Sequence, residues 1–405
     1  MQLIIIESKY RMKIVILHTD FRIYWPARLK ALAIFLSKKG DSLDIIEIAG
    51  SGSPYSFAKK TVISELSWHV LFPDVKMESL RTKKIAANVL KELDALSPDV
   101  LIAGAIAFPS GALAVRWARK HHKRVIIFDD VEVYNNKRNF FTNYVKRFVY
   151  NGVDAMLYPA SSWIPTGKYW GFKTEQLFYA LDVVDNTFWQ NTPVEKVDIA
   201  VPYFIFVGRQ ITVKNIFFLL DCYAVYRKTV EHPYGLLLVG DGPESEKTFA
   251  YVHQKNIKGV VFKPFMQQKH LVSYMSRAKA LILPSVMESW GLVVNEAMSC
   301  AIPVIVSNHC GSSKVLVKDG VNGYTFSPLI HEDLIERMVE FHSLTDMQQK
   351  KMGKASRDII SDWTIGRFVN SVYDAICYVS GKDERRLSCI NKLVINLWSG
   401  RYRPI

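Results

Sequence analysis

The sequence predicts an α/β protein built from two successive doubly wound domains. Short β-branched apolar runs alternate with longer amphipathic stretches, a pattern typical of parallel strands connected by helices. A polar, turn-rich stretch at residues 182–193 interrupts this pattern, which then restarts. With 405 residues, 49% of them hydrophobic and 22% charged, the chain can fill two or three cores and does not have the composition of a disordered protein.

We expect five strands and four helices before the turn-rich stretch. The strands are expected at Lys13–His18, Leu43–Ile48, Asp99–Ala103, Arg124–Phe128 and Ala155–Tyr158. The helices are expected at Ala27–Lys39, Lys83–Leu96, Gly111–His121 and Phe140–Tyr150. The first domain then spans residues 1–190, and residues 1–11 are interpreted as an upstream start of little structural consequence.

The second half repeats the alternation with six strands and six helices. The strands are expected at Tyr203–Val207, Gly235–Val239, Gly259–Phe262, Ala280–Leu283, Pro303–Val306 and Gly323–Phe326. The helices are expected at about 214–229, 244–254, 268–277, 291–300, 331–343 and 347–360. The second domain spans residues 191–365, followed by a C-terminal helix and basic tail at 366–405. Ligands of open α/β sheets bind at the carboxyl ends of strands, so we expect the site in a cleft between the two domains.

The charge and the cysteines restrict the class of partner. The net charge of +14 is shared evenly by the two halves, without the block of like charge that marks a nucleic-acid-binding tail. Such a surface suits anionic small molecules or an anionic membrane surface, and a merely solvated basic surface is the alternative. The five cysteines lack CxxC spacing and are expected as free thiols in a reducing cytoplasm. The most apolar stretch, residues 100–115, contains two glycines and a proline, so no membrane-spanning helix is predicted.

The most informative segment is Pro284–Ala297, in which a turn connects a strand to a helix that we expect to begin near Ser289. The free N–H groups of a helix start bind anions, and Gly291 allows a ligand to approach the main chain. Glu288 lies just before this helix and Glu296 about two turns into it. Two carboxylates beside a phosphate site can accept hydrogen bonds from the ribose and hexose hydroxyls of a nucleotide sugar. The alternative is a solvated loop carboxylate and an ordinary charge on the helix surface.

Two further segments follow strands of the second half. In Gly208–Asn215, Arg209 and Lys214 can neutralise a diphosphate without a metal ion. Val239–Glu244 has the Gly-x-Gly-Pro pattern of a tight turn from strand to helix. A last segment of interest, Asp319–Phe326, follows the Pro284–Ala297 segment in the chain.

From about residue 200 to 380, these segments resemble the retaining family 4 (group 1) glycosyltransferases, whose mark is two glutamates separated by seven residues. The resemblance implies the GT-B fold, with two Rossmann-like domains and a C-terminal helix that crosses back to the first domain through Trp363, Phe368 and Tyr373. It implies that Glu288 faces the donor hexose and that Glu296 holds the ribose. The other implied donor-binding residues are Gly208, Arg209, Lys214, Ser289, Trp290, Gly291 and Leu292.

The first domain departs from the family pattern. Many members have a glycine-rich loop after the first strand, whereas this chain has none between His18 and Arg28. Many have a histidine after the strand that here ends at Asp129, which makes Asp129 the catalytic candidate of this domain. A metal site at Asp129 and Asp130 is the weaker interpretation, because adjacent acids at a strand end commonly cap a turn. Lys314 stands where an acidic residue is common, a change that affects which donor fits.

We therefore expect a metal-independent, retaining hexosyltransferase that uses a UDP- or GDP-linked sugar, needs no cofactor and acts on a glycan or lipid-linked acceptor in surface polysaccharide synthesis. The alternatives are a nucleotide-sugar epimerase of the same fold and a non-catalytic nucleotide- or glycan-binding protein. Aromatic residues interleave with cations in residues 136–150, and apolar residues do so in 385–403. These stretches predict a cytoplasmic protein that associates peripherally with the inner face of the cell membrane, unless they pack onto the first domain instead.

Overall fold

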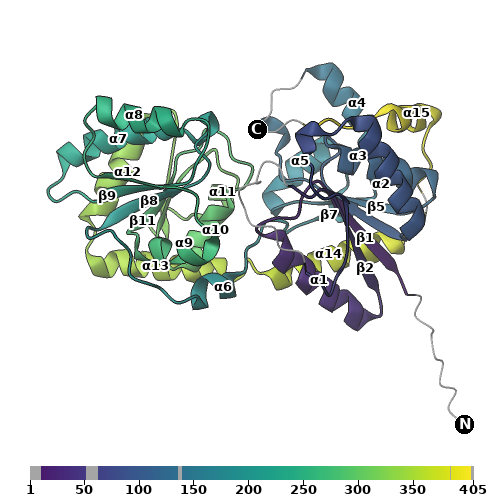
Figure 1. The fold of residues 1–405 in the computed structure, drawn as a ribbon, viewed down its shortest axis with the longest axis horizontal. Coiled ribbons are helices and arrows are strands. Elements are labelled where there is room, and N and C mark those ends of the chain that lie inside the picture. Colours follow the sequence, from purple (N-terminus) through teal and green to yellow (C-terminus); the bar gives the residue numbers. More distant parts are fainter. Residues whose placement is uncertain (1–10, 52–62, 136–138, 384, 403–405) are drawn as a thin grey trace, which may run out of the picture. The chain divides into compact units, whose positions relative to one another are not determined.

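The computed structural model describes residues 11–51, 63–135, 139–383 and 385–402 (Figure 1). The chain forms two compact units. The first unit combines the chain up to Leu181 with the segment from Ile365 onward, and the second unit is the continuous stretch Asp182–Thr364. The predicted upstream start at 1–11 lies outside the described residues except for Arg11.

The first unit contains a seven-stranded parallel sheet in the order β3-β2-β1-β4-β5-β6-β7. Its strands are β1 Lys13–His18, β2 Ser42–Ala49, β3 Ser67–Phe72, β4 Val100–Ala103, β5 Arg124–Phe128, β6 Ala155–Leu157 and β7 Leu177–Phe178. The order reverses between β1 and β4, which is the doubly wound topology that the sequence predicted. The inner strands are apolar along their length because helices cover both faces of the sheet, as the fully buried Ile14–Leu17 of β1 shows.

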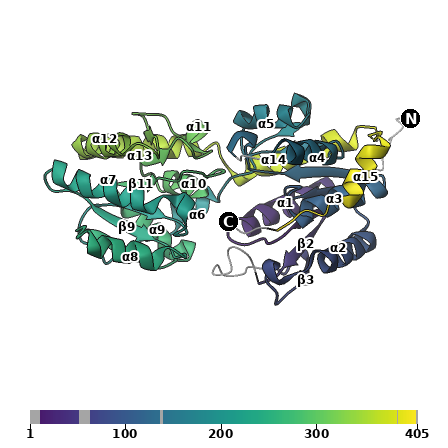
Figure 2. The ribbon, with the colours of Figure 1, turned by 90° about the horizontal axis from the view of Figure 1, so that it is seen from above.

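Seven helices of the first unit lie among the described residues: α1 Trp25–Lys39, α2 Thr82–Leu96, α3 Pro109–Lys120, α4 Phe140–Tyr150, α5 Ile164–Tyr169, α14 Ile365–Ser380 and α15 Cys389–Leu397. Helices α1 and α14 pack together on one face of the sheet, while α2 and α3 lie on the other (Figure 1). Helix α15 packs beside α3 and α4 (Figure 2).

The C-terminal helix α14 covers the first sheet, as predicted for this fold. Its Phe368 ring lies 6.3 Å from that of Trp25, and its Tyr373 ring lies 5.1 Å from that of Phe35. The prediction for Trp363 was wrong. Trp363 precedes the point at which the chain re-enters the first unit, and its ring stacks on Trp290 of the second unit with centroids 6.3 Å apart.

The second unit contains a six-stranded parallel sheet in the order β10-β9-β8-β11-β12-β13. Its strands are β8 Tyr203–Val207, β9 Gly235–Val239, β10 Val260–Lys263, β11 Ala280–Leu283, β12 Val304–Ser307 and β13 Gly323–Phe326. Its helices are α6 Asn186–Asn191, α7 Ile216–Thr229, α8 Ser245–Gln254, α9 Gln268–Arg277, α10 Leu292–Ser299, α11 Ser313–Leu316, α12 His331–Ser343 and α13 Asp346–Ile360. Helices α7 and α8 cover one face, and α9, α10 and α13 cover the other (Figure 1).

The units divide after Leu181 rather than after residue 190. Helix α6 accounts for the difference, because it is held to the second unit by the side chain of Asn186. The Asn186 amide donates to the carbonyls of Ile360 and Trp363, and its oxygen accepts from the Ser299 hydroxyl at 2.9 Å. The segment 366–405, predicted as a C-terminal helix and basic tail, belongs to the first unit.

Candidate functional site

Three loops meet at the carboxyl edge of the second sheet. They follow the neighbouring strands β9, β8 and β11, and main-chain hydrogen bonds join them to one another. The amide of Gln210 donates to Asp241 at 3.0 Å, and the amide of Val286 donates to Val213 at 2.9 Å. The loops that carry the predicted Arg209, Lys214 and Glu288 therefore form one connected backbone surface.

The turn after β9 approaches the loop after β8 so closely that it requires glycine. Gly240 has a φ of +124°, and a Cβ placed there would lie 2.2 Å from the carbonyl oxygen of Gly208. A Cβ on Gly242 would lie 2.3 Å from the carbonyl oxygen of Gln210. The Gly-x-Gly-Pro pattern thus has a local physical cause, because only glycine permits this contact.

Lys214 and Glu288 form an ion pair between two of the loops. The Lys214 ammonium donates to the Glu288 carboxylate, which also accepts from the Ser285 hydroxyl at 3.1 Å. The two side chains are 16% and 19% exposed, so the pair is mostly withdrawn from water but reachable from solvent. Glu288 is therefore not the solvated loop residue of the alternative interpretation. Arg209 and Gly208 lie half-exposed in the same loop as Lys214.

Helix α10 begins at Leu292, within the predicted helix at about 291–300 but three residues after Ser289, near which we expected it to begin. Gly291 is the N-cap in the left-handed conformation, with a φ of +91°, and this turn delays the helix. A Cβ on Gly291 would lie 3.1 Å from the Leu283 side chain and 3.5 Å from the Ser312 hydroxyl. That hydroxyl is buried without a hydrogen-bond partner in the structure, so the free amides of α10 and an unsatisfied hydroxyl lie close together.

The side chain of Trp290 points into the second unit. It is buried, its indole N–H donates to Asn295 Oδ1 at 2.9 Å, and its ring stacks on Trp363. The side chain of Trp290 therefore anchors the loop. For the expected contact with the donor, the main chain of Trp290, Gly291 and Leu292 is available instead. The side chain of Ser289 is half-exposed in the same loop.

Glu296 is buried on α10, with only 3% of its surface exposed. Its carboxylate accepts a hydrogen bond from the Gln268 side chain of α9 at 3.2 Å. Burying a carboxylate is costly unless hydrogen bonds compensate for the lost water, so this position is not an ordinary charge on a helix surface. Burial beside another polar group is what a site for hydroxyl groups requires.

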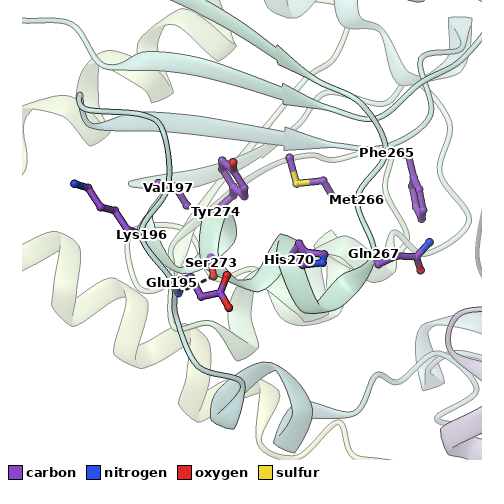
Figure 3. Close-up of a pocket in the computed structure, with 9 residues that line it drawn as sticks. All are labelled: Glu195, Lys196, Val197, Phe265, Met266, Gln267, His270, Ser273 and Tyr274. Carbon is purple, nitrogen blue, oxygen red and sulfur yellow. Dashed lines mark hydrogen bonds between the residues drawn. The ribbon is translucent and has the colours of Figure 1, made fainter.

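A pocket of about 450 Å³ lies beside α9 (Figure 3). Its lining is Glu195, Lys196, Val197, Phe265, Met266, Gln267, His270, Ser273 and Tyr274. His270, Ser273 and Tyr274 lie on the helix face opposite Gln268, because residues two, five and six positions along a helix point away from the first. None of the predicted site residues lines this pocket.

In the first unit, Asp129 follows β5 and closes a tight turn. Its Oδ1 accepts from the Val131 amide at 3.0 Å, and its Oδ2 accepts from the Tyr150 hydroxyl at 3.3 Å. Sequence reasoning missed the neighbouring Tyr158, which follows β6 and has a buried hydroxyl without a hydrogen-bond partner in the structure. Burial, with a smaller contribution from Asp129, raises the pKa of Tyr158 well above its usual range. The available signal was a tyrosine at the end of a predicted strand.

The loop after β1, which lacks glycine, is occupied by aromatic rings. The ring of His18 lies 5.0 Å from that of Phe128 and within 6 Å of Phe21 and Trp25. Its Nδ1 is buried, and burial lowers the pKa of His18 to about 4. His18 is therefore a neutral ring at pH 7, packed among aromatic side chains at the end of β1.

The remaining predicted positions lie apart from these groups. Lys314 is exposed on the short helix α11. Within the described ranges, acidic, histidine and cysteine side chains form no group of three or more that could hold a metal ion. Cys222, Cys300 and Cys310 are buried free thiols, and Cys377 and Cys389 are exposed ones.

Residues 189–359 match the family model of the glycosyl transferases group 1. An uncharacterized glycosyltransferase of Methanocaldococcus jannaschii is 25% identical over 154 residues, which cover 38% of this chain and 42% of that protein. A lipopolysaccharide 1,6-galactosyltransferase of Salmonella typhimurium is 26% identical over 292 residues, covering 68% of this chain and 74% of that protein. The chain thus spans less than half the length of the first of these curated relatives.

Solved structures share the fold along nearly the whole chain. A lipopolysaccharide outer core galactosyltransferase in its apo form superposes with a TM-score of 0.68 at 20% identity, covering 90% of this chain and 99% of that one. The Anabaena protein HepE in complex with UDP gives a TM-score of 0.70 at 15% identity, covering 90% and 100%. The predicted fold class, two Rossmann-like α/β domains of the GT-B type, is confirmed.

Proposed function

The chain carries the domain of the group 1 glycosyl transferases, and from that premise we propose that it is a retaining, metal-independent hexosyltransferase. The donor is a nucleotide sugar, and the acceptor is a glycan or lipid-linked glycan of surface polysaccharide synthesis. No cofactor takes part in this reaction.

The ion pair between Lys214 and Glu288 carries the proposal. An ammonium beside the free amides of a helix start suits a diphosphate, and a carboxylate suits sugar hydroxyls. Each group holds the other in place until the donor arrives. The diphosphate then takes the Lys214 ammonium, which leaves the Glu288 carboxylate to accept a hydrogen bond from the hexose. Arg209 supplies the second positive charge.

Glu296 binds the ribose in this proposal. Its buried carboxylate keeps acceptor capacity beside the bond from Gln268, because a carboxylate has about four lone-pair sites. The related HepE structure contains UDP, which favours a uridine nucleotide over a guanosine nucleotide.

Catalysis consists mainly of positioning and charge stabilisation. The acceptor oxygen forms its bond to the anomeric carbon on the face from which the phosphate oxygen departs. The departing diphosphate takes the acceptor proton, and Arg209 and Lys214 stabilise its negative charge. Asp129 of the first unit is the proposed hydrogen-bond partner of the donor sugar.

The lipopolysaccharide galactosyltransferase relative, which covers 68% of this chain, supports an acceptor of the surface-glycan class. The net charge of +14 supports a working position at an anionic membrane, on the inner face of the cell membrane. The protein is then cytoplasmic and peripheral.

Incubation of the purified protein with a panel of UDP- and GDP-sugars tests the proposal. We expect slow release of nucleoside diphosphate from one donor, and proton NMR should show the freed sugar first in the anomeric configuration of that donor. Glu336→Gln, at an exposed acid of α12 outside the three loops, is the matched control and should keep this activity. An isomerised donor would indicate the epimerase, and binding without turnover would indicate the binding module. Inverted product would overturn retention.

A further inference from the structure

Helices α4 and α15 leave a set of large apolar side chains in solvent. Their exposed fractions range from 52% to 85%. We call this set the α4–α15 face, and its members are Phe140, Phe141, Tyr144, Ile390, Leu393 and Leu397. In the described part of the first unit, Ile34 and Tyr134 are the other exposed large hydrophobic residues, so the apolar exposure is concentrated on two helices that pack against each other. A concentration of this kind marks an interaction surface.

The fold does not need these side chains, because other residues hold both helices. The Asn391 amide donates to the Phe148 carbonyl at 3.1 Å, and Ile395 is buried. The Trp398 indole donates to the Ile106 carbonyl at 2.6 Å. On α15, the exposed apolar positions 390, 393 and 397 follow one another at helical spacing and form a stripe that faces outward.

The charges within the two segments that form the face have one sign. Residues 139–151 and 385–402 contain no aspartate or glutamate. Exposed cations lie among the apolar side chains: Arg147 on α4, Lys392 on α15, and Arg386 and Arg401 beside α15. Aromatic and aliphatic side chains interleaved with cations complement the boundary between anionic headgroups and acyl chains.

The face also extends to the edge of the sheet at which ligands bind. Helix α4 follows β5, so its first residues, Phe140 and Phe141, lie toward the carboxyl ends of the strands. The segment after α15 reaches the loop between β4 and α3, where the Arg401 amide donates to the Ala107 carbonyl at 2.8 Å. A bilayer against this face would therefore lie next to the functional edge of the first unit.

We propose that the α4–α15 face docks the protein on an anionic lipid bilayer, with its apolar side chains in the headgroup boundary. No helix in the described residues is long and apolar enough to cross a membrane, so the docking is an attachment to one surface. The presentation of a lipid-linked acceptor rests on the proposed function, whereas the contact with the bilayer does not.

Co-sedimentation with vesicles tests the proposal. The full chain should bind vesicles of phosphatidylglycerol and phosphatidylethanolamine and remain unbound with phosphatidylcholine alone. The variant Phe141→Ser/Leu393→Ser/Leu397→Ser should partition at least about tenfold less, because burial of each apolar side chain is lost. Lys392→Gln should reduce binding about fivefold, the equivalent of about 1 kcal/mol per cation. The matched control, Leu329→Ser/Ile330→Ser in the second unit, should bind as the unmodified chain does.

Equal recovery of the unmodified protein in the supernatant with both vesicle types would overturn the proposal. So would unchanged vesicle binding by the triple variant, provided that its circular dichroism is unchanged. Donor hydrolysis in solution separates the two hypotheses. If hydrolysis persists while vesicle binding fails, only the docking face is wrong, whereas vesicle binding without hydrolysis contradicts the transferase.

Two exposed cysteines supply a second, positional readout. Cys389 lies at the start of α15 and Cys377 lies on α14, while the other three thiols are buried. An environment-sensitive dye on Cys389, in a Cys377→Ser background, should shift to the blue with anionic vesicles. The same dye on Cys377, in a Cys389→Ser background, should not shift. Equal responses at the two positions would rule out docking through this face.

Discussion

Lys214 and Glu288 lie 74 residues apart in the chain, and their side chains form an ion pair between two loops of one sheet edge. The pair is the point at which the predicted phosphate-binding and sugar-binding elements touch. A partly buried pair of this kind leaves an uncompensated charge when one partner is removed, so each partner's role depends on the other.

We therefore expect Glu288→Gln to lower kcat about 100-fold while the donor KM changes little, because a charge-stabilising contact is lost at the reacting sugar. Lys214→Met should raise the donor KM, since the diphosphate loses its ammonium. In free energy, the loss of kcat/KM in the double variant should be smaller than the sum of the losses in the two single variants, because each single change leaves an unpaired charge. Steady-state kinetics of all three variants decide this, and normal turnover by Glu288→Gln would remove its assigned role.

Glu296→Ala should weaken binding of the nucleoside diphosphate about tenfold to hundredfold, from the loss of one or two charge-assisted hydrogen bonds of about 1.5–3 kcal/mol each. Isothermal titration calorimetry with UDP and GDP measures this effect. Because the side chain is buried, Glu296→Gln serves as the shape-matched control, and it should weaken binding less than the alanine variant does. Unchanged affinity in a folded Glu296→Ala protein would argue against the ribose contact.

Activity should survive excess EDTA if, as proposed, Arg209 and Lys214 supply the positive charge for the leaving diphosphate. The measurement is the rate of donor hydrolysis before and after chelation, with inductively coupled plasma analysis of the protein as the control for residual metal. Complete loss of activity that Mn²⁺ or Mg²⁺ restores would contradict metal independence.

Gly240→Ala should destabilise the second unit by about 3 kcal/mol, since alanine is strained at positive φ and its Cβ would overlap the Gly208 carbonyl. Gly320→Ala is the matched control. Gly320 also has a positive φ, +73°, but its Cβ would meet open space, so the cost should be about 1 kcal/mol. Urea unfolding curves of the two variants give this comparison. Equal losses in the free energy of unfolding would show that the close approach of Gly240 to the Gly208 carbonyl does not affect stability.

His18 should make stability depend on pH. The pKa of His18 in the folded protein is lowered from 6.5 to about 4, so the unfolded chain takes up the proton first as pH falls. The contribution is complete above pH 6.5 and decreases between pH 6.5 and 4, by up to about 3 kcal/mol. His18→Phe keeps an aromatic ring but has no titrating group. Urea unfolding should therefore show a smaller fall in its free energy of unfolding between pH 7 and pH 4 than in that of the unmodified protein. Identical pH profiles would mean that His18 is not the titrating group.

The sequence was most informative where burial alone determines structure. Strands such as β1, β5 and β8 were predicted to the residue because they are continuous apolar runs. The edge strand β3 was missed because Trp68 and His69 interrupt its run of aliphatic residues. Helix α15 was not predicted, although its apolar residues Ile390, Leu393 and Leu397 follow one another at helical spacing.

The candidate site was predicted by residue type but not by contact. Sequence spacing placed Glu288 and Glu296 on either side of a helix start, yet it could not show that Glu296 is buried against α9. Nor could it show that Trp290 turns inward onto Trp363, because both contacts join segments that are distant in the chain. The start of α10 was misplaced because the left-handed Gly291 turn resembles a helix start in its composition.

The return of α14 to the first unit has a consequence for biosynthesis. Phe368, Val372 and Ile376 belong to the core of a unit whose N-terminal part ends at Leu181, so the ribosome must complete the second unit before the core of the first can be completed. The second unit is continuous and can fold as it leaves the ribosome. The first sheet, in contrast, keeps part of one apolar face exposed until α14 has been synthesised. A truncation before Ile365 would therefore destabilise the first unit, although its first 181 residues are synthesised first, and would leave the second unit complete.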